Sequence, residues 1–165
     1  MSSTLLATYD TSAKANDAIH RLVEQGFQNE QMSLMVSDSA KEKHLAIETG
    51  TKAPEGAAGG AVAGGALGAI AAGLTAAAGI VIPGIGFAIA GPLAAALAGL
   101  GAGGAAGGLV GGLVGLGFKE AEAKIVEDEI KKGNIVLAVT HDDRDHMKAA
   151  SDIFEKTKAL STIRA

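Results

Sequence analysis

Hydrophobic and polar positions follow a regular pattern in the first 36 residues of the chain. Residues 4–9 (TLLATY) form an apolar run that is typical of a β-strand, and residues 32–36 form a second one. Between these runs, Asp10, Thr11 and Ser12 offer helix N-caps, and Gly26 marks a helix end. The apolar positions in between recur at helical spacing, at Ala15, Ala18, Ile19, Leu22 and Val23. The pattern predicts a β-α-β unit.

Residues 119–165 show the same pattern after one additional helix. Residues 119–132 form a charged amphipathic segment that ends at Gly133, and residues 135–140 (IVLAVT) predict a strand. Asp142 and Asp143 then cap a helix that continues to about residue 158, and residues 160–164 predict a closing strand. The order of strand, cap and helix therefore repeats that of the first unit.

Two such β-α-β repeats together make a four-stranded, ferredoxin-like sheet. Because one unit alone leaves half of its sheet face uncovered, we expect residues 119–165 to dock with residues 1–36. Residues 37–55 are polar and mixed, and they predict a tether. The expected fold class is α+β, a ferredoxin-like split βαβ sheet of two repeats that is interrupted by a long insertion at residues 56–118.

The insertion contains no charged residue and no histidine over 63 positions, and 21 of these positions are glycine. Glycines recur at every fourth position in two series: Gly56, Gly60, Gly64 and Gly68, then Gly99, Gly103, Gly107, Gly111 and Gly115. A period of four lays them along one helix face, where another backbone can approach closely. Because the eight glycines in residues 56–79 would cost a helix in water roughly 8 kcal/mol, we expect a glycine-zipper helical hairpin held by tight packing or by lipid.

The predicted turn of the hairpin is also its most hydrophobic part. This tip comprises Ile80, Val81, Ile82, Pro83, Gly84, Ile85, Gly86, Phe87 and Ile89, and Gly91 with Pro92 opens the second helix. An apolar tip favours either an end inside a lipid layer or burial against other tips in an oligomer. The uncharged run far exceeds the roughly 20 residues of one membrane crossing and predicts transmembrane helices. The missing Trp and Tyr belts argue against conventional spanning.

Composition removes several functional classes. The net charge is −4, and the chain has neither a basic stripe nor an aromatic row, so we expect no nucleic-acid partner. The absence of cysteine excludes disulfides and thiolate metal sites. The chain starts directly with a strand-like run, which predicts no secretory signal.

One dense group of potential metal ligands occurs, at His141, Asp142, Asp143, Asp145 and His146. Asp142 and His146 are four residues apart and would share a helix face, as pairs of metal ligands do. Helix capping is the simpler interpretation, because acidic side chains stabilise a helix N-terminus and the first repeat holds caps at the matching place without histidine. We therefore expect no metal site here.

No other motif indicates catalysis or a cofactor. Gly84 and Gly86 lack the third glycine of a dinucleotide fingerprint, and no acidic residue follows until Glu120. No lysine or serine lies beside a glycine cluster to complete a phosphate loop, and no histidine has a nucleophile partner. We predict a chain that is not an enzyme, with no cofactor and no identifiable small-molecule substrate.

Three stretches of the chain together resemble a known family. They are ATYDTSAKANDAIHRLVEQGFQNEQMSLMV near the start, GIVIPGIGFAIAGPLAAALAG in the middle and GFKEAEAKIVEDEIKKGNIVLAV after the uncharged run. Over nearly its whole length the chain resembles the bacterial general stress protein 17M-like and low-temperature-induced proteins. The resemblance implies a stress-inducible bacterial protein with a membrane-type insertion, and it does not imply catalysis.

These observations lead to one expected function and three alternatives. We expect a non-enzymatic, stress-associated structural or interaction protein that forms homo-oligomers and associates with a lipid membrane through the hairpin, with both termini cytoplasmic. One alternative is a soluble cytoplasmic homo-oligomeric particle or shell whose hairpins are buried against each other. A pore and a small-ligand sensor on the sheet rank lower, the sensor by analogy of fold alone.

Overall fold

The computed structural model describes residues 3–37, 80–81, 87–99 and 108–165. The strands are β1 (Ser3–Tyr9), β2 (Met32–Ser37), β3 (Ile80–Val81), β4 (Phe87–Ala90), β5 (Ile135–His141) and β6 (Ser161–Arg164). The α-helices are α1 (Ser12–Glu24), α5 (Pro92–Gly99), α6 (Gly108–Gly115), α7 (Glu120–Lys131) and α8 (Arg144–Lys156), and a 3-10 helix, η1 (Asn29–Gln31), precedes β2. The predicted strands and helices of residues 1–36 and 119–165 are present, with ends that shift by one or two residues.

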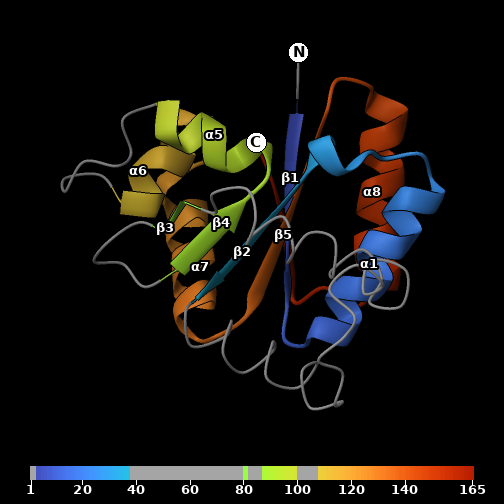
Figure 1. Cartoon of the computed structure of the whole chain (residues 1–165), viewed down its shortest axis with the longest axis horizontal. Helices are drawn as coiled ribbons and strands as arrows, with labels where there is room; N and C mark the ends of the chain where they lie inside the picture. Colours follow the sequence, from blue (N-terminus) through green and yellow to red (C-terminus); the bar gives the residue numbers. More distant parts are fainter. Residues whose placement is uncertain (1–2, 38–79, 82–86, 100–107) are drawn as a thin grey trace, which may run out of the picture.

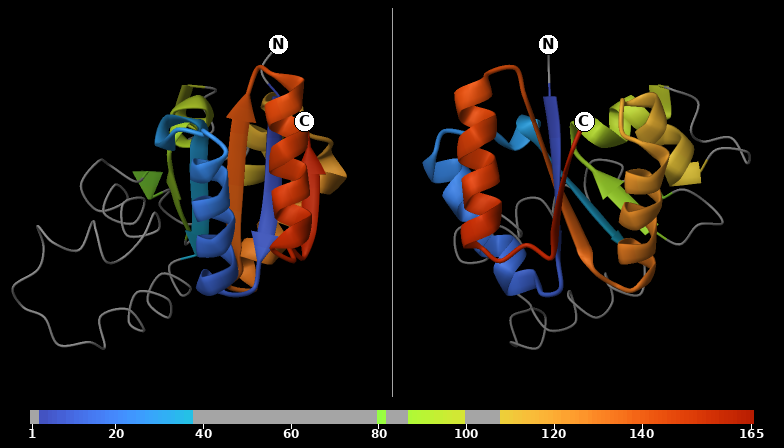
Figure 2. Two further views of the ribbon diagram at one scale, coloured as in Figure 1. Left: turned by 90° about the vertical axis from the view of Figure 1, so that its right-hand side faces the viewer. Right: turned by 180° about the vertical axis from the view of Figure 1, so that it is seen from behind.

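The strands form one antiparallel sheet in the order β3-β4-β2-β5-β1-β6 (Figure 1). β5 lies between β1 and β2, and it pairs with β1 along the full length of that strand, from Ser3 opposite His141 to Tyr9 opposite Ile135. β6 pairs with the outer edge of β1, so the two ends of the chain lie next to each other (Figure 2). The structure confirms the α+β class, with the four predicted strands adjacent in the order β2-β5-β1-β6.

One face of the sheet is covered by α1 and α8, which lie side by side (Figure 2). Because side chains alternate between the two faces of a strand, Leu5, Ala7 and Tyr9 of β1 point to this side. They pack with the apolar faces of the two helices, where Ile19 of α1 and Phe154 of α8 are fully buried. Among the described residues, this first core is built from the two β-α-β repeats.

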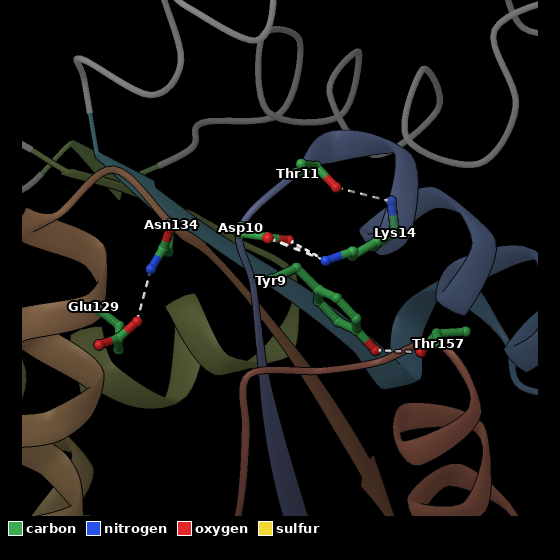
Figure 3. A network of polar contacts seen from close by, with 7 residues as sticks. All are labelled: Tyr9, Asp10, Thr11, Lys14, Glu129, Asn134 and Thr157. Carbon is green, nitrogen blue, oxygen red and sulfur yellow. Dashed lines mark hydrogen bonds and ion pairs between the residues drawn. The ribbon is translucent and has the colours of Figure 1, made fainter.

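Side-chain caps define where α1 and α8 begin. The Thr11 side chain accepts a hydrogen bond from the Lys14 backbone N–H (3.4 Å). The Asp143 side chain accepts one from the Asp145 backbone N–H (3.2 Å). The Asp10 carboxylate pairs with the Lys14 ammonium at 2.8 Å, over the first turn of α1 (Figure 3). The N-cap positions expected from the sequence are therefore occupied in both repeats.

A buried hydrogen bond joins the end of α8 to the end of β1. The Tyr9 hydroxyl lies 2.8 Å from Thr157 Oγ1 (Figure 3). The Thr157 hydroxyl in turn donates to the Ile153 carbonyl at 2.8 Å. Since the Thr157 proton is used in that second bond, Tyr9 is the donor in the first. Burial raises the pKa of Tyr9 to about 12, so the phenol keeps the proton that it donates at neutral pH.

The opposite face of the sheet is covered by α5, α6 and α7 (Figure 1). From the sheet, this second core takes Leu6, Met35, Ile89, Val136 and Ala138. From the helices it takes Leu93, Ala94, Leu97, Leu109, Leu113, Ala123, Val126 and Ile130, together with Phe118 before α7. Part of the uncharged insertion therefore folds back onto the domain and supplies most of one helical layer.

The prediction of transmembrane helices is wrong for the part of the chain that the structure describes. In residues 3–37, 80–81, 87–99 and 108–165, no helix is long and apolar enough to cross a membrane. The two uncharged helices, α5 and α6, have eight residues each, whereas a crossing needs roughly 20.

The predicted hairpin tip also differs from the structure. Ile80, Val81, Phe87 and Ile89 lie in the strands β3 and β4, not in a turn between two helices, and residues 82–86 lie outside the described ranges. β4 pairs with the edge of β2 that β5 leaves free, with Met35 opposite Ile89. This pairing satisfies the backbone groups of β2, and Ile89 is buried in the second core. The open edge of β2 is therefore the physical reason for the difference.

Candidate functional site

The outer face of α6 is the most unusual surface of the described structure. Leu109, Gly112 and Leu113 are buried, and both leucines belong to the second core, whereas Gly111 and Gly115 are exposed on the opposite side of the helix. Val114 lies between them with 42% of its surface exposed. A Cβ atom built on Gly111 would have no other atom within 4 Å. We call Gly111, Val114 and Gly115 the outer α6 face.

The other predicted helix-packing glycines are placed as follows. Gly99 is the last residue of α5. Gly56, Gly60, Gly64, Gly68, Gly103 and Gly107 lie outside the described residues. The structure therefore brings Gly111 and Gly115 of the second series together on one helix face, and this face points away from the second core.

The junction with α7 fixes the orientation of α6. α6 ends in a turn in which Gly117 has φ +100°, and the Phe118 N–H bonds back to the Leu113 carbonyl at 3.1 Å. Phe118 is buried in the second core, and the Lys119 N–H that follows is bonded to the Glu122 carboxylate at 3.1 Å. α6 therefore packs against α7 with its leucines inward and its outer face in solvent.

α5 is positioned by a close approach between Gly91 and the backbone of β2, which no sequence pattern indicates. Gly91 has φ +93°, and a Cβ atom there would lie 2.3 Å from the Met32 carbonyl oxygen and 2.8 Å from the Ser33 Cα. Two residues later, the Leu93 N–H donates to Ser33 Oγ at 3.0 Å, and Ser33 is 1% exposed. Gly91 before Pro92 is a local sequence signal for this junction. Ser33 gives no such signal, because it resembles any other polar residue in a strand.

His141 and His146, from the group of potential metal ligands in the sequence, lie in a compact cluster at the start of α8. The two imidazole rings stack with centroids 4.4 Å apart, and Phe27 meets each ring edge-on at 5.7 Å. His141 Nδ1 accepts from the Asp143 N–H at 2.9 Å, and His146 Nδ1 lies 2.6 Å from the Asp143 carboxylate. The hydrogen bond from His146 lowers the pKa of that carboxyl below its usual value.

This cluster is organised around a helix cap. Asp143 is the N-cap of α8, and both histidines bond to it through Nδ1. Within the described residues, no set of three or more His, Cys, Asp or Glu side chains is arranged to hold a metal ion. Phe27 also belongs to this cluster, although it lies more than 110 residues before His141 in the sequence. Because phenylalanine is not a potential metal ligand, the group of ligands in the sequence does not include it.

Comparisons of the chain with known proteins identify no relative. No family model matches the chain, and neither a curated protein nor a solved structure matches it significantly. The resemblance to the general stress protein 17M-like and low-temperature-induced proteins therefore stays a prediction.

Proposed function

We propose that this chain is a non-enzymatic structural protein that associates with copies of itself through the outer α6 face. The observation that carries the proposal is the exposure of Gly111 and Gly115 on a helix whose opposite side is buried. An exposed glycine destabilises a helix interior by about 1 kcal/mol relative to alanine. Nothing in the described monomer requires glycine at residue 111, because a Cβ atom there meets no neighbour. Close approach of a second backbone would offset this cost.

The charge distribution supports the same surface. Residues 87–118 carry no charged side chain, whereas the ion pairs of the described structure lie on α1, α7 and α8 and at the ends of these helices. Contact between two outer α6 faces therefore removes no charge from water, which is the largest cost in burying a polar surface. The same property suits contact with a lipid membrane, which we propose as a second partner of this face.

We also propose a ferredoxin-like assignment and a role in bacterial stress. The order β2-β5-β1-β6, with α1 after β1 and α8 after β5, supports the assignment, because two interlocked β-α-β units have this order. The role in stress rests on the three resembling stretches of sequence alone. On this proposal the sheet and its first helical layer are a scaffold, and the uncharged helices provide the contact.

Two substitutions at Gly111 test the proposal, because monomer stability and self-association should not change together. We expect Gly111→Ala to raise the free energy of unfolding of the monomer by about 1 kcal/mol, because alanine favours the helix and meets no atom. The same change should weaken self-association at least tenfold, and Gly111→Leu should abolish it, because a side chain holds the backbones apart. Sedimentation equilibrium across a concentration series measures the association, and urea unfolding measures the stability.

Ser151→Leu is the matched control, since it places the same side chain at an exposed position of α8, on the other side of the sheet. It should leave association unchanged. If Gly111→Leu associates as strongly as the original chain, the outer α6 face is not the contact.

Flotation with phospholipid vesicles tests the second proposed partner, the lipid membrane. Large complexes that form without lipid and do not float favour the alternative of a soluble particle.

A further inference from the structure

Aromatic contacts lie at both ends of the first core. At the end of β1, Tyr9 meets Phe154 of α8 edge-on, with ring centroids 6.4 Å apart. At the opposite end of the β1–β5 ladder, Phe27 meets His141 and His146 edge-on, each at 5.7 Å. Burial raises the pKa of Tyr9 to about 12, whereas histidine ordinarily changes charge between about pH 5 and 8. The histidine end is therefore the one that can respond to pH near neutrality.

Phe27 is held in place by the end of α1. Gly26 has φ +93°, and the Phe27 N–H bonds back to the Leu22 carbonyl at 3.0 Å, so the chain turns sharply here. The Phe27 side chain is 2% exposed and belongs to the first core. Both imidazole rings that meet it come from the second β-α-β repeat. The contact therefore joins the two repeats.

The two histidines make different hydrogen bonds with Asp143. His141 Nδ1 accepts from the Asp143 backbone N–H at 2.9 Å, so this nitrogen carries no proton. His146 Nδ1 lies 2.6 Å from the Asp143 carboxylate, and it donates to that carboxylate whether the ring is neutral or charged. An added proton on His146 therefore preserves its hydrogen bond, whereas an added proton on His141 removes the acceptor of the Asp143 N–H.

A proton added to each ring would also place two positive charges face to face. The rings are stacked, with centroids 4.4 Å apart and planes 12° from parallel, and like charges at this distance repel. Besides Asp143, the charged side chains on the adjoining segments are Asp142, Arg144, Asp145, Glu24 and Glu30. Ser3, which lies opposite His141 in β1, is uncharged. Asp143 alone bonds to both rings, and the geometry of these bonds suits one added proton better than two.

We propose that Phe27, His141 and His146 form an acid-sensitive lock between the two β-α-β repeats. The lock is closed while the imidazole pair carries no more than one positive charge, and a second charge opens it. Opening breaks the bond between His141 and the Asp143 N–H and separates Phe27 from the imidazoles. The contact between Tyr9 and Phe154 stays closed. This inference goes beyond the proposed function, because it does not depend on the outer α6 face.

Nuclear Overhauser effects in the full chain test whether the lock opens. At about pH 8 we expect effects between the Phe27 ring and both imidazole rings. At about pH 5.5 these should weaken at least twofold, because histidine is ordinarily protonated there. The effects between Tyr9 and Phe154 should stay unchanged and serve as the internal control. Carboxyl groups ordinarily titrate near about pH 4, so this interval changes mainly the charge of histidines.

Substitution of His141 tests the cause of the opening. In His141→Gln, the side-chain amide oxygen can accept the Asp143 N–H at any pH, and no second positive charge forms. The effects between Phe27 and His146 should therefore persist at about pH 5.5 in this variant. His20→Gln is the matched control, because it removes a histidine at an exposed position of α1. It should lose the Phe27 effects on acidification as the unmodified chain does.

Three results would refute the lock. The first is that the Phe27 effects in the unmodified chain are as strong at the lower pH as at the higher one. The second is that they disappear together with those between Tyr9 and Phe154, because the whole core then unfolds. The third is that His141→Gln loses its Phe27 effects on acidification, because protonation of His141 is then not the cause.

Discussion

Gly91→Ala should lower the free energy of unfolding by about 2–5 kcal/mol. A positive φ costs an alanine about 1–2 kcal/mol, and forcing a methyl group against a packed neighbour adds about 1–3 kcal/mol. The neighbour here is rigid backbone, since the new Cβ atom would lie 2.3 Å from the Met32 carbonyl oxygen. Urea unfolding followed by circular dichroism measures the change.

Comparison of Gly26→Ala with Gly91→Ala isolates the contribution of the close approach at Gly91. Gly26 has the same φ as Gly91, +93°, but a Cβ atom there meets nothing within 4 Å. This variant should therefore lose only the conformational cost of about 1–2 kcal/mol. Equal losses at the two positions would mean that α5 does not start against β2 as the structure shows.

The second large effect is expected at Leu113. This residue of α6 is fully buried in the second core, so Leu113→Ala removes packed methyl groups and leaves a cavity. Substitutions of this kind cost about 2–5 kcal/mol. Val114→Ala, at the next residue, changes a side chain that is 42% exposed and should stay within about 0.5 kcal/mol. Chemical denaturation of both variants gives the comparison.

The pair of variants reports which side of α6 faces the sheet. If Val114→Ala costs more than Leu113→Ala, the helix is turned the other way and the glycine face is inside. If both changes are small, α6 does not pack on the domain, and the second core is not formed by the insertion.

The two β-α-β repeats could be predicted from the sequence because their signals are local. Apolar runs and helical spacing identify the strands and helices, and caps such as Thr11 and Asp143 identify where the helices begin. Gly26 and Gly133 end their helices with positive φ, as their positions in the pattern indicate. Each of these elements is specified by residues within a few positions of one another.

The insertion could not be predicted in the same way because its structure depends on distant partners. A short apolar run such as residues 87–90 suits a strand and a buried helix equally well, and composition alone does not decide between them. The free edge of β2 makes it a strand, and β2 lies about 50 residues earlier in the chain. The hydrogen bond of Ser33 could not be predicted for the same reason, since its partner Leu93 is 60 residues away.

The central claim is that part of the uncharged insertion joins the sheet and covers its second face. Backbone nuclear Overhauser effects between β2 and β4 in the isotope-labelled full chain test it most directly. The account predicts cross-strand effects between Met35 and Ile89 and between Leu34 and Ala90, which are opposite each other in the ladder. Helical sequential effects running through residues 80–92, with none between those residues and β2, would contradict it.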